Sequence, residues 1–288
     1  MNSIHRQYSL QASDGEMLAM DIRMPEGGVN LPVIVVAHGF KGFKDWGFFP
    51  WACQALAQHG FCVINFNFSH NGVEGNGTSF SRLDKFADNT FSREIRELRE
   101  VIDAVVQGTL PLGDHADPTK IYTVGHSRGG GAVLLEGVDD PRVGKIATWA
   151  SVSTFKRYTP SQRERWRKDG YIEAKNARTG QMMRLNIGLL DDLENNPERM
   201  DIENAAANLN RPLLILHGDV DLSVEIQNGE RLYEVSDKHR TRFVTVPRTG
   251  HTFGVVHPFE GTTRALDRVI EETASFFKGG QQTGSGEL

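Results

Sequence analysis

The chain has 288 residues, of which 39% are apolar and 24% charged, a composition typical of a folded globular protein. Its net charge of -5 and its scattered basic residues argue against binding to nucleic acid or to an acidic membrane surface. The N-terminal sequence lacks the apolar segment of a secretory signal, and no apolar run has the length of a membrane span, so we expect a cytoplasmic protein with no membrane partner. The two cysteines, Cys53 and Cys62, lie in apolar patterns and are predicted to be buried rather than paired.

Two segments of strand character open the chain, residues 8–12 and 17–23, and the turn signal Ser13-Asp14-Gly15 between them predicts an antiparallel hairpin. Beyond them, uninterrupted apolar runs of strand length lie at residues 31–38, 61–66, 121–124, 145–150, 213–216 and 241–246. Segments with helical periodicity alternate with these runs, at residues 49–60, 91–107, 127–137, 229–235 and 262–277. Runs without polar alternation are typical of strands covered on both faces. The order therefore predicts an α/β fold, a mostly parallel doubly wound sheet with an antiparallel N-terminal edge.

One stretch, residues 153–209, interrupts this alternation. It contains no strong buried-strand run, although residues 171–183 have the pattern of a small hairpin and residues 201–209 that of a helix leading back to the sheet. A connection of this length between two strands favours an insertion with its own role. We therefore predict a core formed by residues 1–152 and 210–278 and an inserted cap formed by residues 153–209. Residues 279–288, rich in Gly, Gln, Thr and Ser, are predicted to be a flexible tail.

The sequence G-H-S-R-G-G at residues 125–130 lies between an apolar strand and a helix. A sharp strand-to-helix turn strains its central residue and leaves room for little more than hydrogen at the flanking positions, which accounts for Gly125 and Gly129. The hydroxyl of Ser127 would then stand at the carboxyl edge of the sheet, next to a helix N-terminus that favours developing negative charge. This pattern predicts a nucleophile. The alternative is that Ser127 serves as a helix cap.

A serine nucleophile needs a base and an acid that orients the base. Two carboxylates, Asp219 and Asp221, follow the strand at 213–216, and His251 follows the strand at 241–246. The order serine, aspartate, histidine, with each residue at a strand's carboxyl end, is that expected of a catalytic triad. Asp219 remains a rival to Asp221 on this argument. His126 and His217 are interpreted as structural hydrogen-bonding residues, and His257, before Pro258, as the start of the last helix.

The triad also requires two N–H donors for the oxyanion. We expect one from the amide of Arg128 and the other from the amide of Phe40, in the loop His38-Gly39-Phe40-Lys41-Gly42 after the third strand. A plain glycine turn is the alternative for this loop. No metal-ligand spacing and no phosphate-binding glycine motif stands out, so no metal and no cofactor are expected.

Four segments carry a resemblance to the α/β-hydrolase superfamily: H-G-F-K-G at 38–42, G-H-S-R-G-G at 125–130, H-G-D-V-D-L-S-V at 217–224 and G-H-T-F at 250–253. Within the superfamily the chain most resembles the dienelactone hydrolase and cinnamoyl (feruloyl) esterase groups. The resemblance implies an α/β-hydrolase fold with an inserted cap, and it implies that the second aspartate of the third motif, Asp221, is the triad acid. Two departures are a serine where true dienelactone hydrolases have cysteine, and Arg128 where many relatives have a neutral residue. The Arg128 side chain could favour an anionic substrate or pair with a nearby carboxylate.

The resemblance also implies a substrate pocket beneath the cap. Trp166, Tyr171, Met182 and Met183 could line it, although packing of the cap itself is an equal explanation for each, and His70 in the loop 68–72 faces the same crevice.

We therefore expect a serine hydrolase that cleaves small-molecule carboxylic esters, aromatic cinnamoyl or feruloyl esters among them, through an acyl-enzyme intermediate. A peptidase or amidase with the same triad and a non-catalytic ligand-binding protein are the alternatives. The sequence leaves open whether the protein is a monomer or a homodimer.

Overall fold

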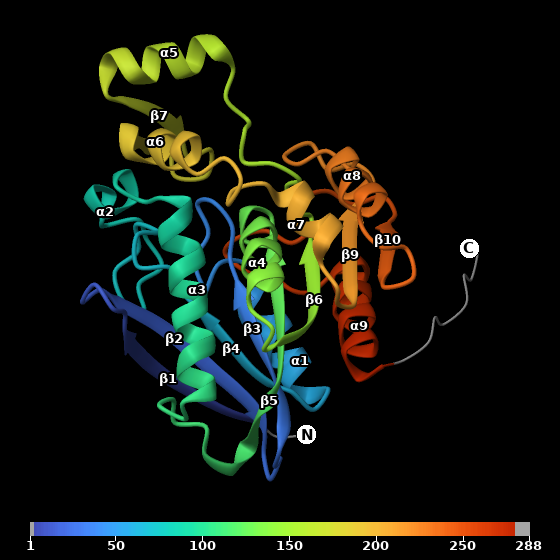
Figure 1. Cartoon of the computed structure of the whole chain (residues 1–288). Helices are drawn as coiled ribbons and strands as arrows, with labels where there is room; N and C mark the ends of the chain where they lie inside the picture. The colour runs from blue at the N-terminus through green and yellow to red at the C-terminus, as the bar shows by residue number, and fades with distance from the viewer. Residues whose placement is uncertain (1–2, 280–288) are drawn as a thin grey trace.

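The computed structural model describes residues 3–279 and has an α/β fold built on an eight-stranded sheet (Figure 1). The strand order is β1-β2-β4-β3-β5-β6-β9-β10. The bounds are β1 Ser3–Gln11, β2 Met17–Pro25, β3 Leu31–Ala37, β4 Cys62–Phe66, β5 Ala116–His126, β6 Val143–Trp149, β9 Leu213–Gly218 and β10 Thr241–Val246. Pairing is antiparallel from β1 to β2 and from β2 to β4, and parallel across the rest of the sheet. The predicted parallel sheet with an antiparallel N-terminal edge is confirmed.

Helices cover both faces of this sheet, which explains why its central strands, such as β3 and β4, are apolar without alternation. In β3, Val33 and Val35 belong to the hydrophobic core on one face, and Ile34 and Val36 to the core on the other. The first face carries α3 (Phe91–Val106), α4 (Arg128–Asp139) and α8 (Gln227–Val235). The second carries α1 (Phe49–Gln58) and α9 (Arg264–Lys278), and Figure 1 shows these two groups on opposite sides of the strands.

The last helix begins later than the sequence suggests. His257 does not start α9, because the chain runs through a cis His257–Pro258 bond and a further loop before Thr263 caps the helix by accepting a hydrogen bond from the amide of Leu266. His257 instead accepts a hydrogen bond from the amide of Gly47 at 2.9 Å and stacks on Trp46. The predicted tail, apart from Gly279, lies outside the described residues. No helix within the described residues is long and apolar enough to cross a bilayer.

Residues 153–209 form the helices α5 (Pro160–Asp169), α6 (Ile187–Asn195) and α7 (Ile202–Asn208) and a separate two-stranded sheet of β7 (Tyr171–Lys175) and β8 (Met182–Asn186). The hairpin and the last helix match the sequence prediction. Helix α7 packs against α4 and α8, whereas β8 packs against α2 (Leu83–Ala87). Figure 1 shows α5, β7 and α6 gathered beyond one end of α3, away from the main sheet. We propose that this segment is the cap over the crevice at the sheet's carboxyl edge.

Candidate active site

The turn between β5 and α4 holds Ser127 in a strained backbone conformation. Its φ is 57° and its ψ is -119°, a combination that residues with a side chain rarely adopt. The turn is tight on both sides of the serine. A Cβ at Gly125 would lie 2.2 Å from the carbonyl oxygen of Gly129, and a Cβ at Gly129 would lie 2.5 Å from the carbonyl oxygens of Ala37 and His38. Glycine at both flanking positions is therefore a steric requirement, as the sequence suggested.

Substituting Gly125 tests this requirement. Because the atoms that an added Cβ would meet are backbone atoms, Gly125→Ala must displace the turn, and we expect it to lower the free energy of unfolding by about 1–3 kcal/mol. Gly188→Ala is the matched control: it lies in α6, a Cβ added there would meet no atom within 4 Å, and alanine is the better helix former. Urea unfolding of the two variants measures the difference. Equal midpoints would contradict the steric explanation.

Asp221 and His251 are in direct contact. Asp221 follows β9 and His251 follows β10, and His251 Nδ1 lies 2.8 Å from Asp221 Oδ2. The other carboxylate oxygen accepts hydrogen bonds from the amides of Ser223 and Val224, at 2.8 and 2.9 Å. Burial alone would raise the pKa of Asp221, but the imidazoles of His217 and His251 and the amide of Val224 outweigh it and hold the pKa well below its usual range. The carboxylate is thus ionised and fixed in orientation.

The rival aspartate has a different environment. Asp219 Oδ1 accepts a hydrogen bond from the amide of Thr249 at 3.3 Å, so Asp219 braces the loop that carries His251. It is exposed, whereas Asp221 is buried. This geometry gives Asp219 a contact with the loop that carries His251 and none with the imidazole of His251 among the described residues.

Two further histidines pack around His251 and Asp221. His126 Nε2 donates to the carbonyl oxygen of His251 at 2.9 Å, and the two rings lie 4.7 Å apart. Burial and the neighbouring His251 lower the pKa of His126 to about 3, so the ring stays neutral. His217 Nε2 donates to the carbonyl oxygen of Val224 at 2.8 Å. Both residues are structural hydrogen-bonding partners, as the sequence indicated.

The loop after β3 lies directly against the Ser127 turn. A Cβ at Gly39 would lie 2.9 Å from Cβ of Ser127 and 3.4 Å from the amide nitrogen of Arg128, so glycine allows this close approach. Phe40 is the next residue, and Lys41 has a φ of 57°. The Lys41 ammonium donates to the carbonyl oxygen of Lys175 at 2.7 Å, which ties the loop to β7. The loop therefore lies where a second amide could reach an oxyanion at Ser127.

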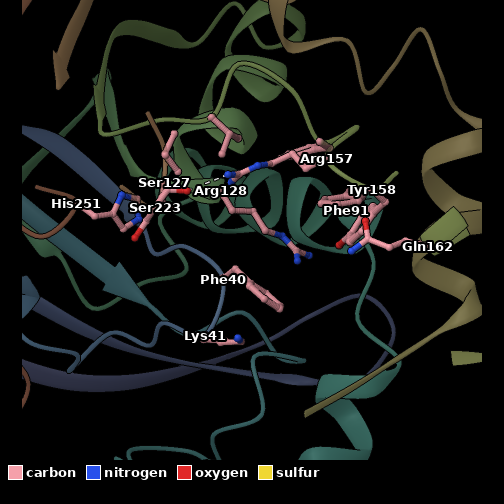
Figure 2. A pocket seen from close by; sticks show the side chains of 13 residues that line it. Phe40, Lys41, Phe91, Ser127, Arg128, Arg157, Tyr158, Gln162, Ser223 and His251 are labelled. Carbon is pink, nitrogen blue, oxygen red and sulfur yellow. Dashed lines mark hydrogen bonds between the residues drawn. The ribbon is translucent and has the colours of Figure 1, made fainter. Parts of the chain in front are cut away.

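A cavity of about 540 Å³ adjoins these residues. Its lining includes Ser127, His251, Phe40 and Arg128, so the structure brings four of the predicted site residues to one place. In Figure 2, Ser127 and His251 lie at one end of the labelled group and Tyr158 and Gln162 at the other, with the Arg128 side chain between them. The remaining lining residues are Lys41, Phe91, Val152, Phe155, Arg157, Tyr158, Gln162, Ser223 and Val224.

The side chains suggested for the substrate pocket do not line this cavity. Trp166 is fully buried against Tyr158, and Met183 is fully buried as well, because the inserted segment needs its own core. Tyr171 packs under the guanidinium of Arg184, and Met182 is half exposed on β8. His70 is buried and bonds through Nδ1 to the hydroxyl of Ser69 at 2.8 Å. These five suggestions were wrong as assignments to this cavity.

Aromatic residues that the sequence analysis did not select form the cavity wall instead. Phe91 and Phe155 stack with their ring centroids 4.1 Å apart, and Tyr158 lies nearby in the same lining. Phe155 and Tyr158 follow β6, so their place just beyond a strand's carboxyl end was a usable signal. Phe91 begins a helix and carried no such signal. Among residues 3–279, no group of three or more His, Cys, Asp or Glu side chains is arranged to hold a metal ion.

Most of the chain is similar in sequence to part of a longer curated protein. A Bacillus subtilis (strain 168) protein, the uncharacterized peptidase YuxL, is 23% identical over 254 residues, which are 86% of this chain and 36% of that protein. The chain thus spans about a third of the length of that curated relative.

Two solved structures share the fold. The esterase domain of a Rhodothermus marinus protein is 20% identical with a TM-score of 0.64, and the match covers 95% of this chain and 97% of that one. Est1E from Butyrivibrio proteoclasticus with ferulic acid bound is 18% identical with a TM-score of 0.70, covering 94% and 98%. The model of the alpha/beta hydrolase family matches residues 34–265, from β3 into α9. Since this match takes in most of the sheet and all four strand-end motifs, the chain belongs to the α/β-hydrolase family.

Proposed function

We propose that this protein is a serine hydrolase that cleaves carboxylic esters, with Ser127 as nucleophile, His251 as base and Asp221 as orienting acid. The observation that carries the proposal is the 2.8 Å contact between His251 Nδ1 and Asp221 Oδ2 beside a cavity that Ser127 and His251 both line. The strained backbone of Ser127 supports it further, because strain of this kind is maintained where it exposes a reactive side chain.

The proposed reaction proceeds in two steps. His251 takes the proton of the Ser127 hydroxyl as Oγ attacks the ester carbonyl, and the amides of Phe40 and Arg128 stabilise the resulting oxyanion. His251 then gives this proton to the departing alcohol, which leaves an acyl group on Ser127. Water, deprotonated by His251, attacks the acyl-enzyme, and the acid product departs as Ser127 regains its proton.

The cavity wall supports aromatic esters as substrates. Phe40, Phe91, Phe155 and Tyr158 offer apolar ring surfaces in the cavity that the proposed nucleophile also lines. Est1E, a structural neighbour by fold, has been solved with ferulic acid bound. We therefore propose that methyl ferulate and related aromatic esters are hydrolysed better than short aliphatic esters.

A peptidase is the second candidate, and the name of the Bacillus subtilis relative favours it. The same residues would attack an amide carbonyl, with an amine as the leaving group.

One substrate panel tests these proposals with the wild-type protein. We expect turnover of 4-nitrophenyl acetate, faster turnover of methyl ferulate than of methyl acetate, and little release of 4-nitroaniline from aminoacyl anilides. A fluorophosphonate probe should label Ser127, and the labelled peptide is identified by mass spectrometry. Anilide cleavage above ester cleavage would favour the peptidase. Failure to label Ser127 together with no turnover would favour a non-catalytic ligand-binding protein.

A further inference from the structure

The side chain of Arg128 is held rigidly in the wall of the cavity. It is 7% exposed, and its Nε–H donates to Glu94 Oε2 at 2.8 Å. The guanidinium carbon lies 4.4 Å from the centroid of the Phe91 ring and 5.6 Å from that of Phe40. A guanidinium between two rings and a carboxylate keeps one orientation, so its free donors are fixed in direction.

The pairing with Glu94 leaves donors of Arg128 unused. Nη2 is enclosed and has no hydrogen-bond acceptor among residues 3–279. Among the described residues Arg128 donates to Glu94 only through Nε, and Oε1 of Glu94 accepts a hydrogen bond from the side-chain amide of Asn89 at 2.7 Å. A buried charged group with an unused donor costs free energy, so an acceptor supplied by a ligand is the simplest account of it.

The cavity as a whole is positively charged. Lys41 and Arg157 line it with Arg128, and none of the thirteen lining residues is an aspartate or a glutamate. Lys41 donates to the carbonyl oxygen of Lys175, and Arg157 to that of Ser223 at 2.9 Å. Neither cation has a carboxylate within ion-pair distance among the described residues. Glu94 therefore offsets one of three positive charges, and an anionic ligand would be attracted into the cavity.

We propose that the substrate of this site carries a carboxylate besides the ester group, and that Arg128 binds this carboxylate. The inference rests on the ester hydrolysis proposed above and names its substrate class. Arg128 directly follows Ser127 and lines the same cavity as His251, so an ester bound by Arg128 would lie close to the proposed nucleophile. The carboxylate could belong to the acyl part or to the alcohol part of the ester.

Two pairs of esters test the effect of charge, because the two members of each pair are similar in shape and differ in whether the second group is a carboxylate or its methyl ester. For the acyl part, 4-nitrophenyl hydrogen terephthalate is compared with its methyl ester, and release of 4-nitrophenol is followed. For the alcohol part, 4-acetoxybenzoate is compared with methyl 4-acetoxybenzoate. We expect the charged member of one pair to have a kcat/KM about 10- to 100-fold higher, which corresponds to one charge-assisted contact. The pair that shows the preference identifies the part of the ester that carries the carboxylate.

The double variant Arg128→Met/Glu94→Gln removes the guanidinium without leaving Glu94 buried and unpaired. Because the backbone amide at position 128 is retained, the proposed oxyanion donor is kept. The readout is the ratio of kcat/KM for the charged ester to kcat/KM for the neutral ester, and we expect this ratio to fall to about 1. Arg240→Met is the matched control, because Arg240 lies before β10, at the opposite end of that strand from His251. This control should keep the wild-type ratio.

Binding to Ser127→Ala gives a second test that does not depend on turnover. Calorimetry with the same four esters should show the charged member of one pair binding about 10-fold more tightly. Equal dissociation constants within both pairs would overturn the anionic substrate class, even if the wild-type protein hydrolyses the neutral esters and the proposed function stands. Preferential binding of a charged ester without any wild-type turnover would support the carboxylate site and refute ester hydrolysis.

Discussion

Replacing Ser127 with alanine is expected to lower kcat for 4-nitrophenyl acetate by about 10⁴- to 10⁶-fold, the loss seen when a serine nucleophile is removed from a working triad. Without Oγ no acyl-enzyme can form, and the turnover that remains must come from the oxyanion donors and from binding alone. Stopped assays with high enzyme concentrations measure the residual rate, and fluorophosphonate labelling should disappear in parallel.

The matched control is Ser161→Ala, an exposed serine on α5. We expect it to change kcat by less than about twofold, because surface substitutions away from a site have small effects. Circular dichroism of Ser127→Ala should match the wild-type spectrum, since the structure shows no hydrogen bond from the Ser127 hydroxyl to another described residue. If Ser127→Ala retained turnover within tenfold of the wild type, Ser127 would not be the nucleophile.

The sheet and the turn at Ser127 were predictable because each leaves a signal in the local sequence. Strands covered on two faces have to be apolar at every position, so β3 and β9 stand out in the sequence without any knowledge of the tertiary structure. In the turn between β5 and α4, Gly125 is required by contact with Gly129 and Gly130, which lie within five positions of it. Gly129 is required by contact with the carbonyl oxygens of Ala37 and His38 at the end of β3, far away in the chain. Chain order then pointed to His251 after β10 and to Asp219 or Asp221 after β9, since each follows its own parallel strand. The choice of Asp221 came from the resemblance to the α/β-hydrolase superfamily.

The inserted segment was predicted less well because its helices carry little periodicity. Helix α5 buries Trp166 and no other residue, so no apolar stripe marks it. Its signal is at the ends instead: Thr159 and Gln162 form a capping box, and Gly170 ends the helix in a left-handed conformation. Outside the inserted segment, helix α2 was missed for a similar reason: it is only five residues long and has no side-chain cap.

The cavity wall depended on long-range packing. Phe91 and Phe155 are 64 positions apart in the chain and meet only because α3 and the segment after β6 converge. Trp166 and Met183 had the right chemistry for a substrate pocket, but an insertion must first bury its own apolar residues. Composition cannot tell these two uses apart. The pairing of the Arg128 side chain with Glu94 could not be predicted from any local pattern either.

Asp221→Asn is expected to lower kcat by about 10⁴-fold while leaving KM nearly unchanged, since a triad that keeps its shape but loses this charge shows a loss of that size. In the wild type Asp221 Oδ2 lies 2.8 Å from His251 Nδ1, and in the proposed mechanism it accepts a hydrogen bond from Nδ1–H. This bond would fix the tautomer and stabilise the imidazolium that forms as Ser127 is deprotonated. An asparagine can present its amide nitrogen to Nδ1 and favour the wrong tautomer. Because the pKa of Asp221 is held well below its usual range, the wild-type carboxylate stays ionised across neutral pH.

Asp219→Asn provides the comparison that distinguishes the two candidate acids. Asparagine keeps a side-chain oxygen that can accept the hydrogen bond from the amide of Thr249, so the loop carrying His251 should stay in place and kcat should change less than about threefold. The two variants make the same chemical change at sites two positions apart. Steady-state kinetics with one ester measures the effect of each on kcat. A large loss in Asp219→Asn with little loss in Asp221→Asn would assign the acid to Asp219. Equal losses in both would mean that charge in this loop, rather than the contact between Asp221 and His251, supports the reaction.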